Sequence, residues 1–73
     1  MPTASDVERI TAAFFEKKEI LFEGCYPVTE KGQKFMKIHC WGKRGRFIMK
    51  MDAELNLYCF TLKTKQWAKI ENY

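Results

Sequence analysis

The residues most suited to chemistry or binding stand together in the stretch HCWGKRGRF, residues 39–47. It places an imidazole, a thiol and an indole in a row, and then the cations Lys43, Arg44 and Arg46 around two glycines. Such a stretch can bind nucleic acid, because Lys and Arg follow the phosphate backbone while bases stack on exposed rings. It can equally be a plain hairpin turn, because Lys and Arg at turns and edges keep sheets from aggregating.

Metal binding and catalysis are not expected from these residues. His39 and Cys40 are neighbours in a predicted strand, so they point to opposite faces, and two further ligands at suitable spacing are lacking. The one histidine has no nucleophile and orienting carboxylate predicted beside it. Asp52 and Glu54 stand near a predicted turn, and Asp52 is interpreted as a turn residue rather than as half of an acid–base pair. We therefore predict a non-catalytic protein without a metal ion or cofactor.

The four residues GKRG, 42–45, do not match a known phosphate-binding loop. The G-x-x-G loop of KH-type RNA-binding domains joins two helices, whereas both flanks here have strand-like sequences. A Walker A loop is longer and ends in Lys followed by Ser or Thr. The segment is interpreted as a hairpin turn.

Composition limits the class of partner. The 73-residue chain has a formal net charge of +4, which favours polyanions or acidic protein surfaces. Hydrophobic residues make up 47% and aromatic residues 15%, which argues against intrinsic disorder. Six Phe, three Tyr and two Trp supply more ring surface than a small core usually holds, so we expect some rings at the surface.

The sequence also predicts a cytoplasmic protein. No apolar run approaches the roughly 20 residues that span a membrane, and the N-terminus lacks the pattern of a secretory signal. Cys25, Cys40 and Cys59 contain no C-x-x-C pair, and each falls within a predicted strand. We interpret them as reduced thiols that pack as small apolar residues, with a disulfide in an oxidising compartment as the alternative.

One helix is predicted at residues 5–18, SDVERITAAFFEKK. Ser5 and Glu8 have the spacing of a capping box, and two lysines stand at the negative end of the helix dipole. The helix end is weakly marked, because no glycine follows. Phe15 is expected at the rim of the buried face. The residues expected to face the core are Val7, Ile10, Ala13 and Phe14.

Strand-like segments follow the helix at short intervals, at residues 19–28, 33–41, 46–51, 57–63 and 67–72. Pro27 is expected to break ladder pairing and to place the end of the first strand at an edge or bulge. The connectors are too short for crossover helices, so neighbouring strands should be antiparallel. We predict an α+β fold in which one N-terminal helix packs on a four- to five-stranded antiparallel β-meander, as a single domain of residues 1–73.

Pairing across the turn at 42–45 decides the exposure of Trp41. With a two- or four-residue loop, Trp41 lies opposite Arg46; with a three-residue loop and a left-handed Gly45, it lies opposite Phe47. We prefer the first register, because a one-residue slip would place charges in the core. The exposed face then carries Phe35, Lys37, His39, Trp41, Arg46, Ile48 and Lys50, and the apolar face carries Met36, Ile38, Cys40, Phe47, Met49 and Met51.

Two functional hypotheses follow. The first is a small binding protein that contacts nucleic acid or a nucleoprotein complex through the basic, aromatic face, with little base-specific readout. Its predicted contact residues are Lys37, Trp41, Lys43, Arg44, Arg46 and Lys50. The second is a protein–protein adaptor or inhibitor, of the accessory kind found on mobile elements, that docks through the same face or an edge strand. Homodimerisation through an edge also fits. A Trp–Arg pair that only stabilises the hairpin is the structural alternative.

Overall fold

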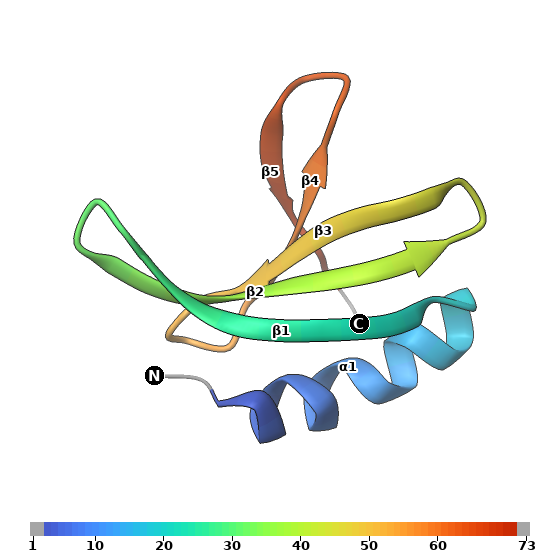
Figure 1. Cartoon of the computed structure of the whole chain (residues 1–73), viewed down its shortest axis with the longest axis horizontal. Coiled ribbons are helices and arrows are strands. Elements are labelled where there is room, and N and C mark those ends of the chain that lie inside the picture. The colour runs from blue at the N-terminus through green and yellow to red at the C-terminus, as the bar shows by residue number, and fades with distance from the viewer. Residues whose placement is uncertain (1–2, 72–73) are drawn as a thin grey trace.

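The computed structural model describes residues 3–71, and within them a single helix packs on one antiparallel sheet (Figure 1). The sheet order is β1-β2-β3-β4-β5, a meander in which every strand pairs with its neighbour in sequence. This confirms the predicted α+β fold. The elements are α1 (Ala4–Lys18), β1 (Leu21–Glu30), β2 (Gln33–Gly42), β3 (Gly45–Met51), β4 (Leu57–Thr61) and β5 (Gln66–Lys69). Residue 72, the predicted end of the last strand, lies outside the described residues.

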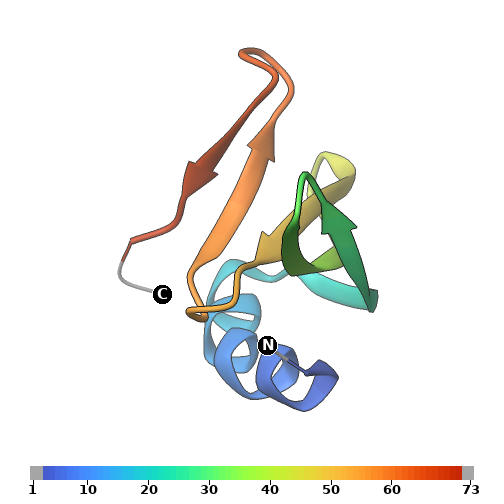
Figure 2. The same ribbon diagram turned by 90° about the vertical axis from the view of Figure 1, so that its left-hand side faces the viewer.

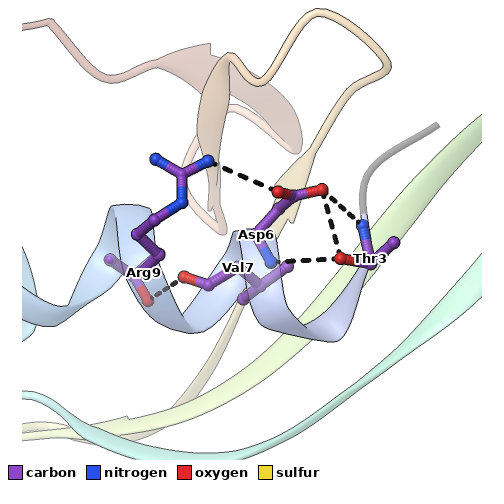
Figure 3. Close-up of polar contacts among 5 residues, drawn as sticks. Thr3, Asp6, Val7 and Arg9 are labelled. Atoms are coloured by element: carbon purple, nitrogen blue, oxygen red, sulfur yellow. Dashed lines mark hydrogen bonds and ion pairs between the residues drawn. The ribbon is translucent and has the colours of Figure 1, made fainter.

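The helix begins one residue earlier than predicted, at Ala4, and its N-cap lies two residues before the predicted one. Thr3 is the N-cap, and its hydroxyl accepts a hydrogen bond from the Asp6 N–H at 3.2 Å (Figure 3). The Asp6 carboxylate in turn accepts one from the Thr3 N–H at 2.9 Å. The predicted Ser5–Glu8 capping box is therefore wrong, because Ser5 already lies inside the helix. Thr3 and Asp6 have the same three-residue spacing, with the aspartate in the role of the usual Glu or Gln.

The helix ends at Lys18, as predicted, although no glycine follows it. Glu19 takes the left-handed conformation there, with φ of 57°, and the Ile20 N–H donates to the Phe15 carbonyl at 2.8 Å. This bond and a second one, from the Glu19 N–H to the Glu16 carbonyl at 3.2 Å, satisfy carbonyls that the end of a helix would otherwise leave unpaired. A non-glycine residue thus closes the helix.

The predicted core-facing side of α1 is confirmed in part: Val7 is buried, and Ile10 and Phe14 are half-buried and packed against the core. The buried residues of the helix are Val7, Thr11 and Phe15, whose spacing of four residues is also a helical face. Phe15, expected at the rim, is only 6% exposed, whereas Ala13, expected in the core, is exposed. Thr11, which was not among the expected core residues, is only 1% exposed. Its hydroxyl donates to the Val7 carbonyl at 2.6 Å, so Thr11 can be buried without an unsatisfied group.

The predicted register between β2 and β3 is confirmed. Trp41 lies opposite Arg46, and Gly42 lies opposite Gly45 across a two-residue turn. Gly45 has a φ of 113°, which favours glycine, but causes no shift of register. The apolar face of the two strands packs under the helix, and only Phe47 of that face is half-buried. Together with α1 and β4 it forms a core of Val7, Phe15, Met36, Ile38, Cys40, Met49, Met51 and Leu57.

Strand β1 is an edge strand that continues through Pro27. Pro27 pairs with Met36, and the ladder continues to Glu30 opposite Gln33, so the expectation that Pro27 ends the pairing is wrong. An edge strand tolerates proline because it has a neighbour on one side only. The irregularity lies earlier, between Phe22 and Gly24, where the register shifts.

The β4–β5 hairpin diverges from the rest of the sheet. The ladder between β3 and β4 consists, within residues 3–71, of three pairs, from Met49–Cys59 to Met51–Leu57. Figures 1 and 2 show the hairpin turning away from β3 beyond these pairs. The sheet is therefore splayed at one end.

The position of the capping box generates a stability prediction. Replacing Thr3 by Ala removes the acceptor for the Asp6 N–H, so we expect the free energy of unfolding to fall by about 1 kcal/mol in urea denaturation. Ser5→Ala is the matched control, because Ser5 lies inside the helix, where alanine is favourable. A loss in Ser5→Ala and none in Thr3→Ala would restore the predicted box and contradict the observed one.

Candidate functional site

One face of the sheet is packed against α1, and the opposite face, here called the open face, has no described element packed on it (Figures 1 and 2). Strand pairing places a row of side chains across all five strands on this face. The row runs from Tyr26 to Lys37, Lys50, Tyr58 and Lys69, each opposite the next. The row thus combines two rings with three cations, and the two lysines Lys37 and Lys50 lie side by side.

Trp41 lies on the open face beside Arg46, as the predicted register requires. The Arg46 guanidinium carbon is 4.8 Å from the centroid of the indole, and Trp41 is 41% exposed. A cation at this distance is attracted to the face of the ring. One large ring and one cation are therefore presented together.

Glu23 binds both members of this pair, a contact that sequence reasoning missed. Its carboxylate accepts a hydrogen bond from the Trp41 indole N–H and forms an ion pair with Arg46 at 3.2 Å. Glu23 lies at the register shift of β1, which regular strand alternation does not anticipate. The carboxylate neutralises part of the positive charge that the sequence assigned to this position.

Lys50 is surrounded by rings rather than extended toward a ligand. Its Nζ lies 5.0 Å from the ring centroid of Phe35, 5.4 Å from that of Tyr58 and 4.7 Å from that of Trp67. These rings come from β2, β4 and β5, so one cation links the β4–β5 hairpin to the rest of the sheet. The alternation of side chains along β4 and β5 could have predicted that Tyr58 and Trp67 lie on this face. It could not have predicted that both rings contact Lys50.

Asp52 positions Tyr58 within this cluster. Its carboxylate accepts hydrogen bonds from the Tyr58 hydroxyl at 2.9 Å, the Asn56 N–H at 2.9 Å and the Glu54 N–H at 2.9 Å. Burial acts to raise the pKa of Asp52, but these bonds and one from the Asn56 amide outweigh it and lower the pKa below 3.8. Asp52 is thus a structural turn residue and ionised at neutral pH.

Two further rings, Tyr26 of β1 and His39 of β2, lie next to each other on the open face. Tyr26 and His39 are stacked with ring centroids 5.5 Å apart, and the Tyr26 hydroxyl is hydrogen-bonded to His39 Nε2 at 3.2 Å. Tyr26 is exposed and His39 half-buried. Because Trp41 follows His39 by two residues on β2, both rings lie on the open face, and Tyr26 lies beside His39 on β1.

The six predicted contact residues separate into two groups. Lys37, Trp41, Arg46 and Lys50 lie on the open face, as their register requires. Lys43 and Arg44 form the tip of the β2–β3 turn at the end of this face, and both are exposed. Lys43 forms an exposed ion pair with Glu19 at 3.3 Å, a kind that contributes little in water.

The cysteines lie within strands, as predicted, and all three are free. Burial is the main cause that raises the pKa of the Cys40 thiol to about 12, and it also raises the pKa values of Cys25 and Cys59. Residues 3–71 contain no cluster of three or more His, Cys, Asp or Glu side chains arranged to hold a metal ion. In the same part of the chain, no helix has the length and apolarity needed to cross a membrane.

Comparison with known proteins finds no family model that matches the chain, and no curated protein or solved structure with significant similarity to it.

The role of Asp52 generates a pH-dependent prediction. Asp52→Asn removes charged acceptors, so we expect the free energy of unfolding at neutral pH to fall by about 1–2 kcal/mol in urea denaturation. Because the folded-state pKa is lowered, this contribution is complete well above pH 3.8 and is lost as the pH falls through the folded-state pKa. Wild type and variant should therefore converge in acid. Glu54→Gln is the control, and a difference that persists unchanged in acid would contradict the assignment.

Proposed function

We propose that this protein binds single-stranded nucleic acid, free or within a nucleoprotein complex, through the open face of its sheet. The observation that carries the proposal is the row of rings and cations on a face that no described element covers. Trp41 on β2 and Tyr26 on β1 are exposed there. Lys37 lies opposite Tyr26 on β2, and Arg46 lies opposite Trp41 on β3. Exposed rings stack with bases, and the cations between them contact phosphates.

A single strand fits this face better than a duplex. Bases in a duplex are already stacked on one another, whereas the unstacked bases of a single strand can lie flat on aromatic side chains. Stacking needs no particular base, so we expect little sequence preference. The function requires no catalytic group and no cofactor, and it agrees with the predicted cytoplasmic location.

The six predicted residues take different roles in this proposal. Trp41 provides the stacking surface, and Lys37 and Arg46 contact phosphates beside it. Lys43 and Arg44 extend the cationic surface past the turn. Lys50 acts indirectly, since its ammonium group holds Phe35, Tyr58 and Trp67 together.

A titration with an oligothymidylate of about 15 nucleotides, followed by tryptophan fluorescence over a range of salt concentrations, tests the proposal. If about four phosphates are contacted, the logarithm of affinity should fall with the logarithm of salt with a slope of about −3. Trp41→Ala should weaken binding about 5- to 150-fold, because a stacked base contributes ~1–3 kcal/mol.

Lys37→Glu should weaken binding and make the salt slope shallower by about 0.7. The charge-matched control is Lys31→Glu, in the turn between β1 and β2, which should retain most of the affinity. Absence of binding at low salt, to DNA and to RNA, would refute the proposal. Unchanged affinity in Trp41→Ala and Lys37→Glu would place the site elsewhere.

Glu23 generates a prediction of the opposite sign. Glu23→Gln removes the carboxylate that pairs with Arg46 and repels phosphate, so affinity for the same oligonucleotide should rise about two- to fivefold, equivalent to ~0.5–1 kcal/mol. The glutamine oxygen can still accept the Trp41 indole N–H, which keeps the ring in place. Glu30→Gln, at the far end of β1, is the control. A loss of affinity in Glu23→Gln would show that ordering of Trp41 and Arg46 matters more than free charge.

A further inference from the structure

A groove with a volume of about 750 Å³ lies where the sheet is splayed, between β3 and the end of β4. The end of α1 and the β2–β3 turn complete its walls. The apolar residues that line it are Ile20, Phe47, Cys59, Phe60 and Leu62. Leu62 is 80% exposed, and Phe47 and Cys59 are only half-buried, so apolar surface faces solvent here.

The groove borders backbone that has no ladder partner. Only Met49–Met51 of β3 pair with β4. The preceding part of β3, from Gly45 to Ile48, therefore has an edge toward the groove without a strand partner among residues 3–71, and so does Phe60–Thr61 of β4. Figure 2 shows the two strands separating from their common loop. A free strand edge is a template for the addition of an extended chain.

The charge around the groove has one sign. The cations that line it are Lys18, Lys43, Arg44, Arg46 and Lys63, and no Asp or Glu is among the described residues that line it. Glu19 and Glu23 lie nearby and pair with Lys43 and Arg46. Lys18, Arg44 and Lys63 have no ion pair within residues 3–71 and remain available to an acidic ligand.

We propose that this groove binds an extended acidic segment of a partner protein, which pairs with the free edge of β3 as an added strand. Side chains of such a strand alternate in direction. One set, apolar, lies against Phe47 and Leu62, and the other set, acidic, reaches the surrounding cations. A nucleic acid satisfies the charges but lacks the peptide N–H and C=O groups that a strand edge pairs with. This site is separate from the open face, although Arg46 borders both.

The test uses the full chain and a fluorescein-labelled heptapeptide, Asp-Val-Asp-Leu-Asp-Val-Asp, with fluorescence anisotropy as the readout at low salt. The counterpart with Lys in place of Asp should bind at least about tenfold more weakly, because it meets like charge. A version with alternate amides N-methylated should also lose binding at least about tenfold, because it cannot form the ladder. In the complex, alternate amides of Gly45–Ile48, those that face away from β2, should become protected from hydrogen exchange.

Variants locate the site. Lys63→Glu and Leu62→Ser should each weaken the acidic heptapeptide about fivefold or more, whereas the charge-matched Lys31→Glu, outside the groove, should change it less than about twofold. Lys63 and Leu62 are both exposed, so neither change removes core packing, and circular dichroism checks the fold.

Four outcomes would overturn the proposal: no binding of the acidic heptapeptide, equal binding of its lysine counterpart, equal binding of the N-methylated form, or no effect of Lys63→Glu. A fifth outcome assigns the groove to nucleic acid instead: oligothymidylate displaces the heptapeptide, and Lys63→Glu weakens both ligands equally. Loss of oligothymidylate binding in Trp41→Ala with unchanged heptapeptide binding would support two separate sites.

Discussion

The pairing of β2 with β3 across the Lys43–Arg44 turn is the constraint on which the rest of the structure depends. Side chains of a strand alternate between two faces, so one register decides the environment of every residue from Gln33 to Met51. In the observed register Met36, Ile38 and Cys40 are buried under α1. Trp41 and Arg46 consequently face solvent together. A slip of one residue would bury charges and remove both the core and the candidate site.

Two of the cations on the open face, Arg46 and Lys50, are bound by other side chains of the protein itself. Glu23 holds Trp41 and Arg46, and three rings surround Lys50. The Glu23 carboxylate reduces the net positive charge of this face below the value that a count of Lys and Arg indicates, and the rings keep the Lys50 ammonium group in place. These contacts also order the rings, which lowers the entropy lost when a ligand binds. Binding on this face is therefore expected to use both the ordered ring surface and the positive charge that Glu23 leaves unpaired.

The splayed end of the sheet has a different character. The open face combines rings with cations. The groove has apolar walls between cations, beside backbone that lacks a strand partner. The two surfaces meet at Arg46 on β3. A small domain that buries a modest share of its surface can thus present two surfaces of different chemistry.

Local pattern predicted the helix, the strands and the meander, because each rests on periodicity and short connections, and it favoured the observed β2–β3 register over the three-residue alternative. It also placed Lys37, Trp41, Arg46 and Lys50 on one face. Tertiary structure decided the rest. Thr11 can be buried because its hydroxyl bonds to the Val7 carbonyl of its own helix, and Pro27 is tolerated because β1 is an edge. The Glu23 contact arises from a register shift, the Lys50 cluster from three strands that meet, and the groove from the divergence of β4. The Glu23 contact, the Lys50 cluster and the groove have no periodic signature, because each joins residues from different strands.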